Sequence, residues 1–365
     1  MKQNKKLSVL FAANVNPSRS GGVGRSMESL SDGLKCLGHS TEVVYHAQFS
    51  RIPLGYIFFG IWLCFTRLLF VKAKPDWIIA RSSDGFFCAC AVRLFGLNTR
   101  VALHNHGWEE KVFEVERRIQ RPEGAAKTTL LAHLIRFPLL RGTLQLSHAC
   151  ISGTLDECRW LVRQFPKHRA KMAYIPNGIS VEISPVWNSA EQFPPRFLFI
   201  GGTTWKKNPD YAAKIFRHIA VVLPDAEFHL VGTSVIPQPL MQFAKQCTCI
   251  RGIDPQEMVQ RYRYSPFVIS TSRYEGGHAY VLLEAMVQGC IVCVVSLQST
   301  SEFLHTGKNG VELHGQDAAV DAQIIVALYT EQSRLAELSR NAYATAGRNL
   351  IERQSRRLEL VLCTR

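Results

Sequence analysis

The stretch RFLFIGGTTWKKNPDYAAKIF, residues 196–216, indicates the fold class because it passes from an apolar run through a glycine turn into a helix-like pattern. The apolar run predicts a strand, and Asn208 followed by Pro209 is typical of an N-cap and the first position of a helix. The same order of strand, loop and helix recurs from the N-terminal run LSVLFAANV onward. Such alternation is typical of a parallel sheet covered by helices on both faces.

The length of the chain, 365 residues, exceeds what one hydrophobic core usually serves, so we expect two domains. The alternation is interrupted by NGISVEISPVWNSAEQFPP, whose prolines and polar residues suit a linker. We therefore predict an α/β protein of two doubly wound, Rossmann-like domains facing a central cleft, with ligands at the carboxyl ends of the strands. The expected boundaries are residues 1–180, a linker at 181–195, residues 196–345, and a C-terminal helix at 346–365 that could cross back to the first domain.

The composition favours a folded protein with anionic partners. Hydrophobic residues make up 47% and charged residues 20% of the chain, which argues against disorder. The formal charge of +14 leaves nucleic acid, phosphorylated small molecules and an anionic membrane surface open as partners. A basic nucleic-acid-binding protein is one alternative, but no zinc, RNA-recognition or helix-turn-helix pattern supports it, so we expect no nucleic acid.

The eleven cysteines are odd in number and lie mostly in apolar runs, which indicates reduced, structural thiols and a cytoplasmic location. Cys290 and Cys293 have redox-motif spacing but fall in the strand-like run CIVCVVS, where we expect a structural role.

Two apolar segments imitate targeting or membrane signals. The N-terminal run MKQNKKLSVLFAANVN is interrupted by Asn14 and Asn16, so we interpret it as a first strand rather than a signal peptide. The run from Ile52 to Val71 contains two glycines and Arg67, which weaken a transmembrane assignment. An interior helix and a helix on the membrane surface both stay open. Further along, we expect residues 108–126 to be rich in loops and residues 128–141 to be helical.

Two loops predict phosphate binding. In NVNPSRSGGVGRSMES, Gly21 and Gly22 present backbone N–H groups at a helix N-terminus, where anions are favoured. Met27 occupies the place of a third glycine, so a dinucleotide-binding oxidoreductase is disfavoured. In IGGTTWKKNPDY, Lys206 and Lys207 stand beside another helix start and would suit a diphosphate.

A third loop predicts the binding of hydroxylated rings. In SRYEGGHAYVLLEAMVQG, residues 272–289, we expect a helix from His278 to Gln288 with Gly289 as its stop. Glu284 falls opposite the apolar stripe of this helix, and Glu275 precedes it. Carboxylates accept hydrogen bonds from the vicinal hydroxyls of sugars and ribose. The three loops together therefore predict a ligand with phosphate in the middle and a hydroxylated ring at each end.

The histidines of HNHG alternate on a strand and share a face. This arrangement occurs in some metal sites, but no carboxylate or cysteine set completes one, so we expect no metal. We predict instead that His106 contacts a sugar.

The ordered set strand-GG-helix, HGWE, IPNGIS, FIGG...KKN and SRYEGG...LLEAMVQG covers nearly the whole chain and resembles the retaining glycosyltransferases of family four, which have the GT-B fold. The resemblance implies that Glu275 binds hydroxyls of the donor sugar, that Glu284 binds the ribose, and that Lys207 neutralises the leaving diphosphate. It further implies that His106 faces the transferred sugar and that backbone near the phosphates or acceptor is supplied by Gly21, Gly22, Gly276, Gly277 and His278.

The chain departs from the family pattern at two points. Glu275 and Glu284 are one residue further apart than usual, so the turn at Gly277 and His278 must bulge. Gly202 stands where the family commonly has an arginine, and Lys206 is the expected substitute.

We expect a metal-independent, retaining transferase that moves a sugar from a nucleotide diphosphate sugar to a glycan or lipid-linked acceptor, without a further cofactor. Cell-surface polysaccharide or lipopolysaccharide biosynthesis is the expected setting, in the cytoplasm, with contact to the inner face of an anionic plasma membrane left open. A sugar-nucleotide isomerase or a non-catalytic relative of the same fold is the second alternative.

Overall fold

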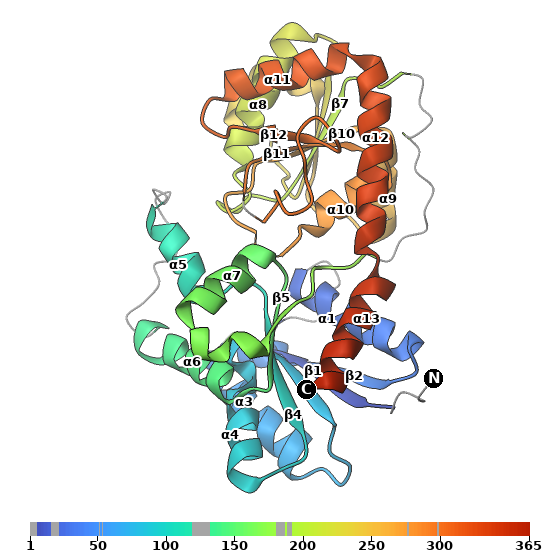
Figure 1. Cartoon of the computed structure of the whole chain (residues 1–365). Coiled ribbons are helices and arrows are strands. Elements are labelled where there is room, and N and C mark those ends of the chain that lie inside the picture. The colour runs from blue at the N-terminus through green and yellow to red at the C-terminus, as the bar shows by residue number, and fades with distance from the viewer. Residues whose placement is uncertain are drawn as a thin grey trace. The chain divides into compact units, whose positions relative to one another are not determined.

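The computed structural model of the protein describes residues 6–15, 22–50, 52, 54–118, 132–179, 187, 192–275, 277–297 and 299–365. These residues form two compact units (Figure 1). Unit 1 contains the described residues up to 118, those from 132 to 179, and those from Ile351 onward. Unit 2 contains those from Trp187 to Leu350.

Unit 1 is built on a six-stranded sheet in the order β2-β1-β3-β4-β5-β6, with every neighbouring pair parallel. Its strands are β1 (Ser8–Ala13), β2 (Ser40–Tyr45), β3 (Trp77–Arg81), β4 (Arg100–Asn105), β5 (Ala149–Ser152) and β6 (Met172–Tyr174). Its helices are α1 (Gly22–Cys36), α2 (Ala47–Ser50), α3 (Gly55–Cys64), α4 (Phe86–Phe95), α5 (Glu109–Arg118), α6 (Phe137–Leu146), α7 (Leu155–Gln164) and α13 (Ile351–Thr364). Consecutive residues of β3 enter different core clusters: Trp77 packs with α1 and α13, whereas Ile78 packs with α3 and α4. The sheet is therefore covered on both faces, as expected for a doubly wound domain.

Unit 2 repeats this plan with the order β12-β11-β10-β7-β8-β9, again all parallel. Its strands are β7 (Arg196–Ile200), β8 (Glu227–Val231), β9 (Cys247–Ile250), β10 (Phe267–Ser270), β11 (Ile291–Val295) and β12 (Val311–Leu313). Its helices are α8 (Pro209–Val222), α9 (Pro255–Tyr264), α10 (Tyr280–Val287), α11 (Ala318–Thr330) and α12 (Gln332–Ala346). The two Rossmann-like units confirm the fold class predicted from the alternating pattern.

The chain returns to unit 1 through α13, which packs beside α1 (Figure 1). Ile351, Leu358 and Leu362 of α13 join the core that Met27 and Leu34 of α1 line. Two polar contacts fix the register of α13. The Trp77 indole N–H donates to the Leu362 carbonyl at 3.1 Å, and the His39 and Glu359 side chains meet at 3.1 Å.

Two local expectations were wrong. Residues 108–126, which we expected to be rich in loops, contain α5. The first turn of α5 carries Glu109 and Glu110, whose negative charges complement the helix dipole. The helix expected to end at Arg141 continues to Leu146, because Leu140 and Leu144 supply one buried face. The beginning of that predicted helix, residues 128–131, lies outside the described residues.

The apolar run from Ile52 to Val71 forms α3 and a π-helical turn, Phe65–Leu69. Phe59 and Leu63 are buried against the sheet, whereas Phe70 is 78% exposed. Among the helices that the structure describes, none is both long and apolar enough to cross a membrane.

All eleven cysteines are free, and Cys290 and Cys293 are fully buried beside and within β11. Burial raises the pKa of Cys293 to about 12, which suits a structural thiol.

Candidate active site

The predicted phosphate and sugar loops of unit 2 meet at the carboxyl ends of two adjacent strands. Strand β7 pairs with β10, and the loops that follow them are hydrogen-bonded to each other. The Arg273 backbone N–H donates to the Lys206 carbonyl at 2.7 Å, and the Thr271 hydroxyl lies 2.9 Å from the Lys207 carbonyl. The two loops therefore form one surface at the position where open parallel sheets bind ligands.

The central pair of this surface is Lys207 and Glu275, whose side chains form an ion pair. Both side chains are mostly buried, with exposed fractions of 27% and 15%. Gly201 makes room for this pair: a Cβ added there would lie 2.7 Å from the Lys207 Cβ. The structure thus brings together the two residues that the sequence assigned to the diphosphate and to the donor sugar.

The start of α8 differs from the expectation in one respect. The helix begins at Pro209 as predicted, but Asn208 adopts a left-handed conformation with φ 53° and its side chain makes no capping hydrogen bond. Its amide oxygen instead accepts a hydrogen bond from the Arg273 guanidinium at 3.1 Å. Asn208 therefore joins the two loops rather than capping the helix.

Gly202, where the family commonly has an arginine, lies in a tight glycine turn with φ 64°. Gly232 packs against it so closely that an added Cβ there would lie 2.4 Å from the Gly202 Cα. Two other cations stand nearby in the same loops. Lys206 places its ammonium 6.0 Å from the Tyr274 ring, and Arg273 reaches Asn208 as described above. Lys206 was expected at this site from the sequence, whereas Arg273 was not.

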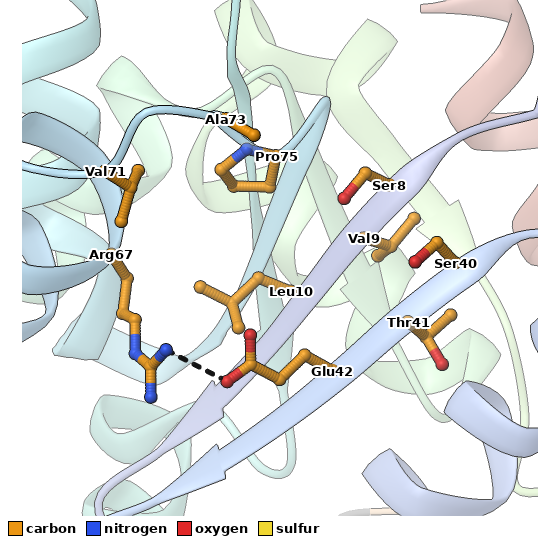
Figure 2. A pocket seen from close by; sticks show the side chains of 10 residues that line it. All are labelled: Ser8, Val9, Leu10, Ser40, Thr41, Glu42, Arg67, Val71, Ala73 and Pro75. Carbon is orange, nitrogen blue, oxygen red and sulfur yellow. Dashed lines mark ion pairs between the residues drawn. The ribbon is translucent and has the colours of Figure 1, made fainter.

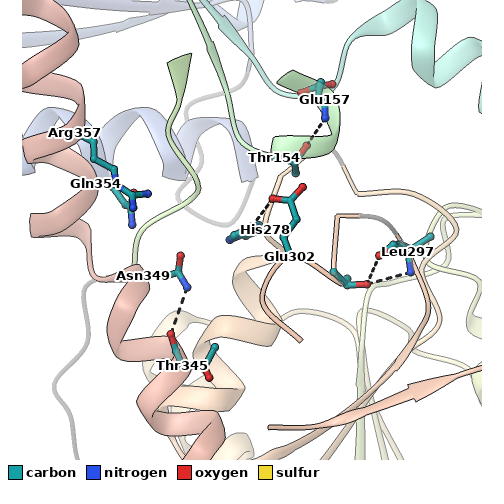
Figure 3. Close-up of polar contacts among 10 residues, drawn as sticks. Thr154, Glu157, His278, Leu297, Glu302, Thr345, Asn349, Gln354 and Arg357 are labelled. Carbon is teal, nitrogen blue, oxygen red and sulfur yellow. Dashed lines mark hydrogen bonds and ion pairs between the residues drawn. The ribbon is translucent and has the colours of Figure 1, made fainter. Parts of the chain in front are cut away.

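Helix α10 begins at Tyr280, two residues later than expected, and Gly289 follows its end with φ 79°. Just before the helix, the His278 side chain is buried. Its Nε2 lies 3.2 Å from Oε2 of Glu302, and both side chains are more than nine-tenths buried (Figure 3). The His278 side chain is therefore held inside unit 2 by Glu302.

Glu284 lies on α10 with Tyr262 beside it. The Tyr262 hydroxyl donates to Glu284 Oε2 at 3.2 Å and also lies 3.2 Å from the Val281 carbonyl. The apolar stripe predicted for this helix is buried, as expected.

In unit 1, His104 and His106 follow each other on one face at the end of β4, with ring centroids 4.0 Å apart. Burial lowers the pKa of His104 to about 4, and burial together with the charges of His104 and Arg81 lowers the pKa of His106 well below its usual range. The imidazole of His106 is therefore neutral at physiological pH, and its buried Nε2 has no partner among the described residues.

Gly22 is the first residue of α1, and no described atom lies within 4 Å of a Cβ built on it. Gly21 and Gly276 lie outside the described residues. Gly277 lies between Glu275 and α10 as the sequence required. Across the part of the chain that is described, His, Cys, Asp and Glu side chains form no group of three or more suited to a metal ion.

A cavity of about 150 Å³ lies at the opposite, amino ends of the unit 1 strands (Figure 2). Arg67 points across it to Glu42 at 3.1 Å, and the start of β1 forms one wall. None of the predicted site residues lines this cavity.

Comparison with solved structures shows the same architecture over nearly the whole chain. Sucrose-phosphate synthase from Thermosynechococcus elongatus superposes with a TM-score of 0.71 at 13% identity, covering 96% of this chain and 97% of that one. A glycosyltransferase from Rickettsia africae gives a TM-score of 0.69 at 14% identity and covers 98% of both chains. HepE from Anabaena, solved with UDP and glucose, gives a TM-score of 0.69 at 15% identity and covers 98% of this chain and 100% of that one. No curated protein sequence matches the chain.

The two parallel six-stranded units and these structural matches define a glycosyltransferase fold of the GT-B type. Two family models match the chain in sequence. The model described as Glycosyltransferase Family 4 matches residues 20–183, and the one described as Glycosyl transferases group 1 matches residues 194–331. The chain belongs to the family-four glycosyltransferases.

Proposed function

We propose that this enzyme transfers a hexose from a nucleotide diphosphate sugar to a hydroxyl group of a glycan or lipid-linked acceptor, with retention of the anomeric configuration and without a metal. The observation that carries the proposal is the ion pair between Lys207 and Glu275 at the carboxyl ends of β7 and β10. The pair sets a cation suited to the diphosphate beside a carboxylate suited to sugar hydroxyls. The bond that must break in the donor joins its sugar to its diphosphate.

Departure of the nucleoside diphosphate builds negative charge, which needs preorganised cations. Lys207 is held by Glu275, and Arg273 and Lys206 bring further positive charge in the same two loops. Each contact of this kind contributes about 2 to 4 kcal/mol to the stabilisation of the transition state. A metal ion is not required for this neutralisation, and Arg273 compensates for the absence of an arginine at Gly202.

Retention is proposed to occur on the face from which the diphosphate leaves. The bond between the anomeric carbon and the phosphate oxygen breaks, and the acceptor oxygen bonds to the same carbon. The acceptor proton passes to the leaving phosphate oxygen. Glu275 is engaged by Lys207, which favours a role in binding hydroxyls over attack on the sugar. His106, at the end of β4 and neutral, is proposed to contact a hydroxyl of the transferred sugar.

The proposed setting is cell-surface polysaccharide or lipopolysaccharide synthesis in the cytoplasm, with contact to an anionic membrane. Phe58, Phe65 and Phe70 are 50%, 46% and 78% exposed on α3 and the turn after it, and Arg67 lies among them. Exposed rings beside basic residues suit an anionic bilayer surface. Sedimentation with anionic liposomes tests this part, and pelleting that salt does not weaken would refute it.

The test of the donor site is a thermal-shift screen with UDP, GDP, ADP, CMP and their sugars. We expect one nucleotide class to stabilise the protein, Lys207→Ala to remove the effect and Glu284→Ala to reduce it. Lys214→Ala is the matched control, because Lys214 is an exposed lysine on α8. The chosen donor is then incubated with candidate acceptors, and the product's anomeric proton is read by NMR. No stabilisation by any nucleotide would overturn the proposal.

A further inference from the structure

The N-terminus of α7 carries the sequence TLDE, residues 154–157, which has the pattern of a capping box. The Thr154 hydroxyl accepts the Glu157 backbone N–H at 3.1 Å, as such a box requires (Figure 3). The glutamate of a capping box usually returns to the backbone N–H of its own N-cap residue. Here the Glu157 Oε1 instead accepts the Trp108 backbone N–H at 2.5 Å, and its Oε2 has no partner among the described residues. The Glu157 carboxyl group thus serves a loop 49 residues earlier in the chain rather than its own helix.

This use of the Glu157 side chain lowers the stability of the fold. The residue is 2% exposed, and burial raises the pKa of its carboxyl group to about 7, although the Trp108 N–H and the Lys111 charge act in the opposite direction. A buried carboxyl group with an incomplete set of partners costs free energy. Costs of this kind are typical of residues that serve a functional site.

The hydrogen bond fixes the chain next to the residue assigned to the transferred sugar. Strand β4 ends at Asn105, and only Gly107 separates His106 from Trp108. Gly107 has φ 112°, so the chain turns sharply there. The Trp108 ring is fully buried in a core cluster, and its indole N–H donates to Glu110 at 3.2 Å. His106 therefore lies between the end of a strand and a residue whose ring and backbone are both held.

A second contact joins the same two segments. Lys111 of α5 and Asp156 of α7 form an ion pair, and their side chains are 13% and 20% exposed. Asp156 and Glu157 are neighbours at the start of α7, whereas Trp108 directly precedes α5. Helix α7 thus holds the connection after β4 at two points. Of these two contacts, the one made by Glu157 lies closer in the chain to the turn that carries His106.

We propose that Glu157 is a positioning residue for His106: its carboxyl group holds the turn at Gly107 through the Trp108 backbone and so sets the place of the imidazole. The inference rests on the proposed function, in which His106 contacts the transferred sugar. It adds a residue that acts on the transfer step through another residue. Deprotonation of Glu157 tightens the hold, because a carboxylate accepts a hydrogen bond more strongly than a carboxylic acid does. The polar and titratable groups that face Glu157 are Lys111 of α5, Asp156 of α7, Asn105 of β4 and Cys150 of β5.

The first test is an NMR titration of the Trp108 backbone amide in the full chain between about pH 5 and about pH 9. The amide proton is expected to move downfield as the pH rises, and to stay in place in Glu157→Gln, whose amide oxygen accepts the bond but does not titrate. The His106 ring resonances are expected to shift in Glu157→Ala and not in Glu114→Ala. Glu114 is the matched control because it is an exposed glutamate on α5.

The second test is a double-mutant cycle on turnover of the donor that the thermal-shift screen identifies. Glu157→Ala is expected to lower kcat about tenfold and to leave the affinity for the nucleoside diphosphate within about twofold, because His106 is assigned to the sugar. Glu157→Gln is expected to restore most of the loss, and Glu114→Ala to behave like the unchanged chain. The variant that combines Glu157→Ala with His106→Ala is expected to be no slower than His106→Ala. Thermal unfolding shows which variants are folded.

A Trp108 amide that does not titrate, or that titrates equally in Glu157→Gln, would overturn the inference. Additive losses of kcat in the cycle would overturn it too, because they would mean that Glu157 does not act through His106. The titration of Glu157→Gln keeps the test decisive even where Glu157→Ala does not fold. A chain that turns over no donor would refute the proposed function instead, and the two NMR measurements would still decide whether Glu157 holds the turn.

Discussion

Replacement of Gly201 by alanine tests whether the position of Lys207 matters for donor binding. The added Cβ would lie 2.7 Å from the Lys207 Cβ and 2.9 Å from its Cγ. Carbon atoms pack at about 3.5 to 4.0 Å, so the stem of Lys207 must move by about 1 Å. A misplacement of about 1 Å costs about 100-fold in catalysis, and we expect turnover to fall by that amount. The affinity for the nucleoside diphosphate should fall about tenfold, or by about 1.4 kcal/mol.

The assay is isothermal titration of the nucleoside diphosphate that the unchanged chain binds, followed by donor turnover. Gly252→Ala is the matched control, because the space beside this glycine of unit 2 is open. Thermal unfolding of both variants separates displacement of Lys207 from loss of the fold. The reasoning is refuted if Gly201→Ala is folded and binds as well as the control while Lys207→Ala does not bind. That result would mean that the ammonium reaches the ligand by a route that does not need Gly201.

Three further outcomes are expected. Glu284→Ala should weaken binding of the ribonucleotide about tenfold and that of its 2′-deoxy analogue less, measured by competition titration; equal losses would exclude a contact with the ribose 2′-hydroxyl. His278→Ala should lower the free energy of unfolding by about 1 to 3 kcal/mol, and combining it with Glu302→Gln should cost less than the sum, in a urea double-mutant cycle; additive losses would show that the two side chains do not interact. Burial raises the pKa of Glu157 from 4.5 to about 7, so the folded state holds a proton that the unfolded state releases, and stability falls as the pH rises from 4.5 through 7. Glu157→Gln should remove about 3 kcal/mol of this dependence, seen as a smaller loss of melting temperature between about pH 5 and about pH 8, and an unchanged slope would contradict the burial of the carboxylate.

The fold followed from the sequence because each unit repeats one local pattern. Apolar runs of strand length end in glycine or polar turns, and the helices after them carry apolar residues at helical spacing. The prediction of a loop-rich segment at residues 108–126 was wrong because Glu109, Glu110 and Lys111 make the segment look polar throughout. The helix in this segment is supported by a contact that the local sequence does not show. The Arg141 guanidinium donates to the Glu110 carboxylate at 2.8 Å, and the two residues are far apart in the chain.

The site was predictable where its chemistry depends on the residues of a single loop. Lys207 and Glu275 were named separately, and the sheet order places their loops next to each other. Arg273 and the partnership of His278 with Glu302 were missed, because a single sequence does not show which side chains meet across loops. A cavity of about 310 Å³ at the carboxyl ends of β1 and β3 was missed for the same reason, because Asn14, Asp84 and Arg136, which line it, come from three segments that only the folded sheet brings together.

The return of α13 to unit 1 has a consequence for biosynthesis. Residues 351–364 complete the core of unit 1, yet the ribosome makes them only after the whole of unit 2. Domains generally fold in the order of their synthesis, and here that order is broken. Until α13 emerges, the surface of α1 that Leu358 and Leu362 cover, together with the Trp77 indole, stays exposed on the nascent chain. Unit 2 can therefore finish folding while unit 1 still waits for its last helix.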